Sequence, residues 1–256
     1  MIKKLIVMCT LIALCASACF GQPSAELGNQ STYVASTSWV ASIAELAGID
    51  EVVSIAPANL KHPPEYEITA DDMASVIKAE LFMYAGYEKM MKTIKEAAEV
   101  APEKVIQVKT TNTLENLETM AAMLSAKAGT QQKAKERFAS YKAMIEEARS
   151  RIKELGLNKL TVYANTNQAQ LARDLGLNVV SEFGAAPLTS NQIAEAARCK
   201  YDIAIDNVHN PVASPIADVS PDTVILTWRN FPDHIGDNAL YNVIKDNIDM
   251  LFDAII

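Results

Sequence analysis

The chain has 256 residues, half of them apolar and 21% charged, and its formal net charge is −8 at neutral pH. This length suits one large domain or two small ones, and the composition is that of an ordinary globular protein. The acidic balance argues against a nucleic-acid-binding surface, which needs clustered Lys and Arg.

The N-terminus has the pattern of an export signal. Lys3 and Lys4 precede an apolar run over 5–16, and small residues follow at 16–18. The run is too short to cross a bilayer as a helix, which needs ~20 residues, and it matches the apolar centre of a secretory signal. We therefore predict a signal peptide over 1–18.

Cys19 follows the small residues directly, in the place where a lipoprotein signal peptidase leaves a lipid-modified cysteine. Ala16 stands where such signals usually have Leu, so simple cleavage after A-x-A is the alternative. The polar segment 19–32 predicts a membrane tether. Only Cys199 then remains in the folded part, which excludes an internal disulfide.

From residue 33 onward, strand-like and helix-like segments alternate. Val40, Ile43, Ala44 and Ala47 fall on one face of a helix, and Gly48 follows at the place of a C-terminal helix cap. The first half predicts strands over 33–35, 51–55, 80–85 and 105–108, with helices over 36–47, 70–78 and 88–99. Alternation of this kind predicts a parallel α/β sheet.

The second half repeats this order. The segment A-E-L-A-G-I-D-E-V-V-S, ending at Ser54, has a counterpart in A-R-D-L-G-L-N-V-V-S, ending at Ser181. The second half predicts strands over 160–163, 178–181, 202–205 and 224–227, with helices over 168–175, 190–199 and 239–254. The fold class is therefore α/β, with two four-stranded parallel-sheet lobes over 33–112 and 157–256.

Helical segments over 113–156 separate the lobes. Gly129 divides them into helices over 114–128 and 131–155. At 1.5 Å per residue the second helix spans roughly 35 Å, which predicts one long connecting helix that runs along both lobes.

A cleft between the lobes is the expected ligand site, because parallel sheets bind ligands at the carboxyl ends of their strands. Catalytic signatures such as G-x-S-x-G, H-E-x-x-H or a P-loop are missing from the sequence, so we expect no enzyme and no catalytic cofactor. All three histidines fall in predicted loops on the cleft side, as do several carboxylates, and such groups bind Zn²⁺ or Mn²⁺. These candidates are His62, His209, His234, Glu182, Asp206 and Asp233.

Several segments resemble the metal-capture proteins of manganese and zinc ABC importers, a family of solute-binding proteins with a helical backbone between two lobes. H-P-P-E-Y-E-I-T-A-D-D-M (62–73) with K-A-E-L (78–81) looks like the family's H-E-Y-E-P-x-P-x-D followed by K-A-D-L. V-V-S-E-F (179–183) resembles the strand that carries its third ligand. G-D-N-A-L-Y-N-V-I-K-D-N-I-D (236–249) is similar to its closing helix.

The resemblance implies four metal ligands, which this sequence matches unevenly. Pro64 occupies the first His position, with His62 two residues earlier, and Thr111 or Asn112 falls at the second. Glu182 matches the third. The fourth, an Asp in the family, falls near Trp228, with Asp233 and His234 as displaced substitutes.

Three functions stay open on the sequence alone. The resemblance implies an exported, lipid-anchored protein of the cell surface or periplasm that delivers Zn or Mn, as transported ligand, to an ABC permease. The site would be rebuilt from His62, Glu182, Asp233 and Asn112. The alternative is a metal chelate or tetrapyrrole (haem, cobalamin or siderophore) stacked on Trp228 and Tyr66. The third is an anchored structural lipoprotein without a small ligand.

Overall fold

A computed structural model describes residues 33–97 and 100–255 of the chain. The predicted signal peptide, Cys19 and the tether lie outside these residues. Within the described ranges, no helix has the length and apolar character needed to cross a bilayer.

Two four-stranded parallel sheets form the centres of two lobes, as predicted. The N-terminal sheet holds β1 (Tyr33–Ala35), β2 (Val53–Ser54), β3 (Leu81–Tyr84) and β4 (Val105–Gln107), in the order β2-β1-β3-β4. The C-terminal sheet holds β5 (Thr161–Asn165), β6 (Asn178–Phe183), β7 (Ile203–Asn207) and β8 (Val224–Trp228), in the matching order β6-β5-β7-β8. The same order in both sheets confirms the repeat between the halves.

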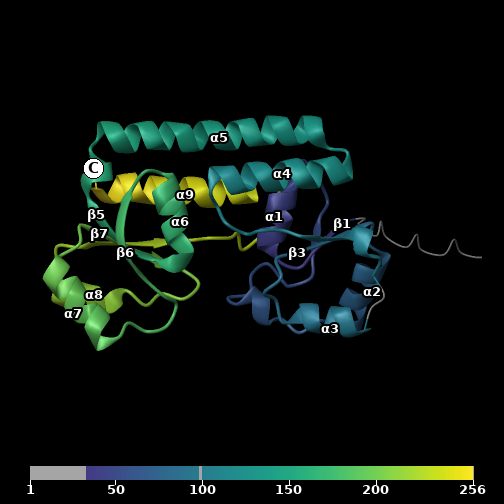
Figure 1. Ribbon diagram of the computed structural model, residues 1–256, viewed down its shortest axis with the longest axis horizontal. Coiled ribbons are helices and arrows are strands. Elements are labelled where there is room, and N and C mark those ends of the chain that lie inside the picture. The colour runs from purple at the N-terminus through teal and green to yellow at the C-terminus, as the bar shows by residue number, and fades with distance from the viewer. Residues whose placement is uncertain (1–32, 98–99, 256) are drawn as a thin grey trace, which may run out of the picture. The chain divides into compact units, whose positions relative to one another are not determined.

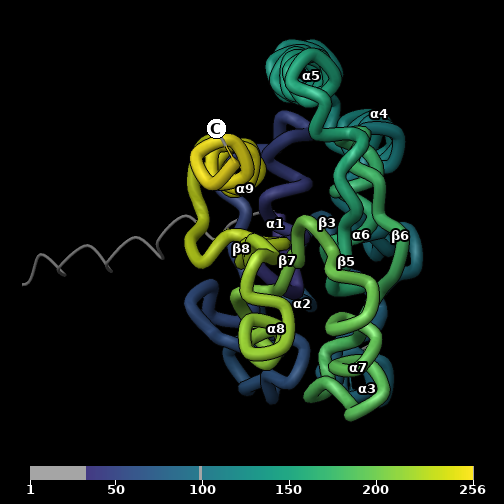
Figure 2. Tube along the Cα trace, turned by 90° about the vertical axis from the view of Figure 1, so that its left-hand side faces the viewer, coloured from purple at the N-terminus to yellow at the C-terminus, as the bar shows by residue number. Residues whose placement is uncertain are grey.

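Helices cover both faces of each sheet (Figures 1 and 2). One helical layer contains α1 (Ser38–Leu46), α4 (Leu114–Ala128), α5 (Gln131–Glu154), α6 (Thr166–Asp174) and α9 (Ala239–Ile255). The opposite faces are covered by α2 (Ala70–Lys78), α3 (Met90–Ala97), α7 (Ser190–Cys199) and α8 (Ser214–Val219). Short 3-10 turns lie at Pro63–Glu65, Pro102–Lys104 and Leu157–Lys159.

Local signals determine several helix ends. Thr69 and Asp72 form a capping box, so α2 begins where predicted. Gly129 has a φ of 72°, which ends α4 in the left-handed conformation that glycine adopts without strain. Helix α7 has the predicted range 190–199, and it is capped by Thr189, whose side chain accepts the backbone N–H of Gln192. Helix α8 was not predicted.

All four strands of the second sheet run further toward their C-terminal ends than predicted. Asn165 pairs with Phe183, and Asn207 pairs with Trp228, so the ladder continues past the positions where the apolar pattern stops. These extensions place Glu182 and Trp228 within strands instead of in loops.

A single apolar core connects the two lobes. It includes Ile43 of α1, Tyr141 and Ile145 of α5, Val162 of β5 and Leu251 of α9. Smaller clusters lie beneath the opposite sheet faces, under α2 and α3 in one lobe and under α7 and α8 in the other. Because both lobes share one core, we expect them to unfold together.

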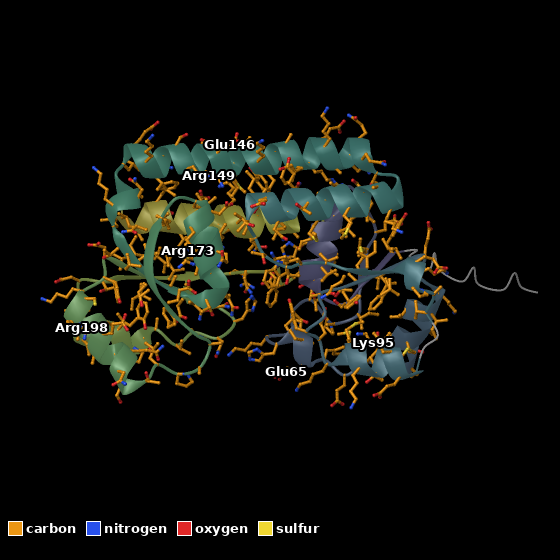
Figure 3. All side chains as sticks on the ribbon, in the orientation of Figure 1. Glu65, Lys95, Glu146, Arg149, Arg173 and Arg198 are labelled. Atoms are coloured by element: carbon orange, nitrogen blue, oxygen red, sulfur yellow. The ribbon has the colours of Figure 1, made fainter. Side chains whose placement is uncertain are left out.

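The long helix α5 is anchored at both ends by ion pairs. Near its start, Arg137 Nη2 lies 2.8 Å from Asp50 Oδ1 of the N-terminal lobe. Near its end, Arg149 Nη2 lies 2.7 Å from Asp174 Oδ1 of the C-terminal lobe. Helix α5 therefore spans both lobes (Figures 1 and 3), as the connecting-helix prediction requires.

Replacement of Ile145 by Ala tests the shared core. We expect Ile145→Ala to lower the free energy of unfolding by about 2–5 kcal/mol, because the side chain is fully buried and its removal leaves a cavity. Chemical denaturation followed by circular dichroism and by Trp fluorescence should show one transition for both variants.

Glu146→Ala is the matched control on the exposed face of the same turn (Figure 3). Its ion pair with Lys142 is exposed, so the change should stay below ~0.5 kcal/mol. Two separate transitions, of which only one shifts in Ile145→Ala, would contradict a shared core.

Candidate ligand site

A cavity of about 490 Å³ opens between the two lobes. The N-terminal lobe contributes Thr37, Trp39, Lys61, His62, Tyr87 and Thr110. The C-terminal lobe contributes Asn167, Asn207, His209, Asn210, Asn230 and Phe231. Its volume lies in the range of ~300–1,000 Å³ that is typical of small-molecule sites.

The sheet topology places the cavity. In each sheet the strand order reverses between the first and third strands, β1 and β3 or β5 and β7, and ligands bind outside the carboxyl ends at such a switch point. Thr37 follows β1 and Tyr87 follows β3. Asn167 and His209 follow β5 and β7 in the same way. The cavity therefore joins the switch points of both lobes.

Three rings form one wall of the cavity. The imidazole of His209 stacks on Phe231, with centroids 3.8 Å apart and planes 8° from parallel. Phe231 in turn stacks on Trp39 of α1, with centroids 5.7 Å apart. The stack thus runs from the N-terminal lobe to the C-terminal lobe.

The residues between β8 and α9 that cross to the N-terminal lobe, 229–233, are called here the crossing segment. Asn247 of α9 holds its start, since the Asn247 amide both accepts from Arg229 N–H (2.9 Å) and donates to Arg229 C=O (2.7 Å). From the other lobe, Asn112 Nδ2 donates to Asn230 C=O (2.7 Å) and Ser38 Oγ donates to Pro232 C=O (2.7 Å). These bonds position Asn230 and Phe231 at the cavity.

His209 is partly buried against the stack. Burial, followed by the charge of Arg229, lowers the pKa of His209 to about 4, so the imidazole is neutral at physiological pH. Its Nε2 is buried and has no hydrogen-bond partner among the described residues. A neutral imidazole nitrogen without a partner is available to coordinate a metal ion.

His62 lines the same cavity from the opposite lobe. It precedes the turn Pro63–Glu65 and is exposed, so its ring is free to adjust. Its charge is one of the causes that oppose protonation of His209. The two imidazoles, one from each lobe, therefore face the same space.

Buried carboxylates at the strand ends are engaged in holding loops. Glu88 accepts the N–H groups of Ala85 (2.7 Å) and Gly86 (2.6 Å) as well as the hydroxyl of Ser36. Asp206 accepts the N–H groups of Asn207, Val212 and Ala213 at 2.7–2.8 Å. None of the described residues that line the cavity is Asp, Glu or Cys.

The predicted carboxylate ligands and His234 are not among the residues that line the cavity. Glu182 lies on β6, where its side chain pairs at 2.6 Å with Arg173 of α6 (Figure 3). Asp233 pairs with Arg229 at 3.1 Å and contacts His234 Nδ1 at 3.0 Å. Throughout residues 33–97 and 100–255, no group of three or more His, Cys, Asp or Glu side chains is arranged to hold a metal ion.

The predicted stacking residues also lie elsewhere. Trp228 ends β8 and is fully buried in the core, whereas Trp39 of α1 lines the cavity. Tyr66 donates its hydroxyl to Asp72 at 2.9 Å. Asn112 is 6% exposed, and its side chain links Trp39 Nε1 (3.0 Å) to the crossing segment.

Asn230 and Phe231 line the cavity but were not among the candidates predicted from the sequence. Both lie between the last predicted strand (224–227) and the last predicted helix (239–254), in the segment that also holds the predicted candidates Asp233 and His234. An aromatic residue next to an amide in such a loop was the available signal.

The buried state of His209 predicts an acid-sensitive fold. Above pH 6.5 the imidazole is neutral in both the folded and the unfolded chain, so it adds no pH dependence to the free energy of unfolding. As the pH falls from 6.5 to about 4, the unfolded chain binds the proton first, and the free energy of unfolding should fall by roughly 1–3 kcal/mol.

His209→Asn should remove this part of the decrease in the free energy of unfolding at low pH. Chemical denaturation of both variants at several pH values measures the difference. NMR titration of the His209 ring protons checks the pKa itself. A midpoint near 6.5 in the folded wild type would overturn the assignment.

Comparison with known proteins supports the fold. No family model matches the chain, and no curated protein matches it by sequence. Among solved structures, it is similar to the Mn-bound periplasmic metal binding protein of Candidatus Liberibacter asiaticus, with 14% identity, 88% of this chain and 99% of that chain covered, and a TM-score of 0.63.

Two further structures are similar over comparable lengths. The solute-binding protein FpvC of P. aeruginosa, solved with Ni²⁺, has 14% identity, 87% and 96% coverage, and a TM-score of 0.68. The laminin binding protein of Streptococcus agalactiae, described as an adhesin with metal-transporting activity, has 16% identity, 87% and 98% coverage, and a TM-score of 0.65. At these identities the comparisons show that this chain has the fold of metal-binding and solute-binding proteins.

Proposed function

We propose that the chain is the extracytoplasmic solute-binding protein of an ABC importer and that it captures a divalent transition metal between its lobes. The observation that carries this proposal is the convergence of two imidazoles, His62 and His209, from opposite lobes on one cavity at both switch points. The similarity in fold to proteins solved with Mn and Ni supports it.

The donor set favours a metal that accepts nitrogen ligands. Imidazole suits Zn²⁺, Ni²⁺ and Cu²⁺, whereas Mn²⁺ prefers carboxylate and other oxygen ligands. Because the described lining residues supply two imidazoles and no carboxylate, Zn²⁺ or Ni²⁺ fits this cavity better than Mn²⁺.

The structure also suggests how capture would be signalled. A metal held by His62 and His209 would bridge the lobes, while α5 and the shared core oppose wide hinge motion. Capture would therefore order the 61–64 turn and shift the lobes slightly, and a permease in the membrane would recognise that form. Binding and release, without catalysis, are sufficient for this role.

Substitution of the two histidines tests the proposal. In calorimetric titrations of untagged protein with ZnCl₂ or NiCl₂, His62→Ala and His209→Phe should each lower the affinity at least tenfold. The phenyl ring of His209→Phe keeps the stack on Phe231 while removing both nitrogen donors.

Glu182→Ala is the matched control, since Glu182 pairs with Arg173 outside the cavity, and its metal affinity should equal that of the wild type. If Glu182→Ala lost metal binding while the histidine variants bound like the wild type, the proposal would be contradicted, and Glu182 would be the metal ligand, as predicted from the sequence.

Membrane attachment through Cys19 is the second part of the proposed function. Detergent phase partitioning of cells should place the wild type in the detergent phase and Cys19→Ala in the aqueous phase. Cys199→Ala, at the exposed end of α7, is the control and should partition like the wild type. Wild-type protein in the aqueous phase would contradict lipidation.

A further inference from the structure

The charge of the cavity sets a condition on its ligand. A divalent ion that loses its water needs a compensating negative charge nearby, because burial of an unpaired charge is strongly unfavourable. Glu88 and Asp206 are occupied by backbone N–H groups. Among the described lining residues, Lys61 is cationic and none carries a negative charge.

Coordination leaves room for a second ligand. Two imidazoles fill two positions, whereas Zn²⁺ in proteins usually takes four ligands and octahedral ions take six. The cavity of about 490 Å³ is also far larger than an ion with one or two waters, since a water molecule occupies ~30 Å³. Both observations show coordination positions and space that the two imidazoles do not fill.

Asn230 offers a contact for an organic molecule. Its side chain is 5% exposed and lines the cavity, and its Oδ1 is a buried acceptor without a partner in the described part of the chain. An acceptor left in this state destabilises the fold unless a donor reaches it. Its backbone C=O accepts from Asn112, which fixes the backbone of Asn230 at the cavity wall.

From these observations, and resting on the proposed function, we infer that the metal enters the cavity as a neutral complex with a small anionic chelator that has amine and carboxylate donors. The chelator carries the negative charge that the cavity lacks. His62 and His209 complete the coordination. The chelator's N–H donates to Asn230 Oδ1, and its carboxylates accept from Lys61 and from hydroxyls such as Thr110.

Nickel iminodiacetate is a suitable probe, because it is neutral, has one N–H and two carboxylates, and leaves coordination positions open for two imidazoles. Untagged wild-type protein would be titrated by calorimetry with NiCl₂, with the preformed 1:1 complex and with iminodiacetate alone. We expect the complex to bind at least tenfold more tightly than NiCl₂, and iminodiacetate alone to bind at least tenfold more weakly than the complex.

A matched ligand and a matched variant isolate the role of Asn230. Nickel N-methyliminodiacetate lacks the N–H and should bind about tenfold more weakly than the parent complex. Asn230→Asp keeps the shape and adds the missing negative charge. This variant should therefore bind NiCl₂ about tenfold more tightly than the wild type does. Equal affinities for the two complexes, with no gain for NiCl₂ in Asn230→Asp, would overturn the role of Asn230.

The outcomes separate this inference from the proposed function. If NiCl₂ or ZnCl₂ binds as tightly as the complex and His209→Phe abolishes that binding, a bare ion is the solute, and the chelator inference falls while the proposed function stands. If iminodiacetate alone binds as tightly as the complex, the metal is not recognised, and the inference also falls. If no metal form binds to protein with an intact circular dichroism spectrum, both fall.

Discussion

The ligand site depends on the hydrogen bonds that hold the crossing segment where the two lobes meet. This stretch of backbone has left the sheet, so its N–H and C=O groups need side-chain partners once they are buried. Asn247 satisfies Arg229 from the C-terminal lobe, while Asn112 and Ser38 satisfy Asn230 and Pro232 from the other. Phe231 is thereby fixed between Trp39 and His209, and the cavity wall is built from both lobes.

The helical layer makes this arrangement rigid. One core passes through α1, α4, α5 and α9 and reaches both sheets, and ion pairs attach α5 to each lobe. Closely packed interiors do not deform continuously, so wide opening of the cavity would disrupt that core. Adjustment is left to exposed parts of the rim, such as the turn at His62.

The chemistry of the cavity differs from what the fold would lead one to expect. Carboxylates do occur where strands end, yet Glu88 and Asp206 stabilise loops by accepting backbone N–H groups. What reaches the cavity is the neutral imidazole of His209, the imidazole of His62, the ammonium group of Lys61, several amides and hydroxyls, and stacked rings, with no carboxylate among the described lining residues. A shared fold therefore supplies the place for a ligand, and the side chains decide its charge and size.

The sequence by itself determined the α/β class, the repeated strand order, the connecting helix and the sheet edge at which the cavity lies, because apolar periodicity and capping residues act locally. It also indicated His62 and His209. Only the tertiary structure decided which strand-end residues reach the cavity. Strand pairing carried Glu182 and Trp228 into the second sheet, and contacts between the lobes brought Asn230, Phe231 and Trp39 together. Such pairings join residues distant in the chain, and local sequence patterns hold no record of them.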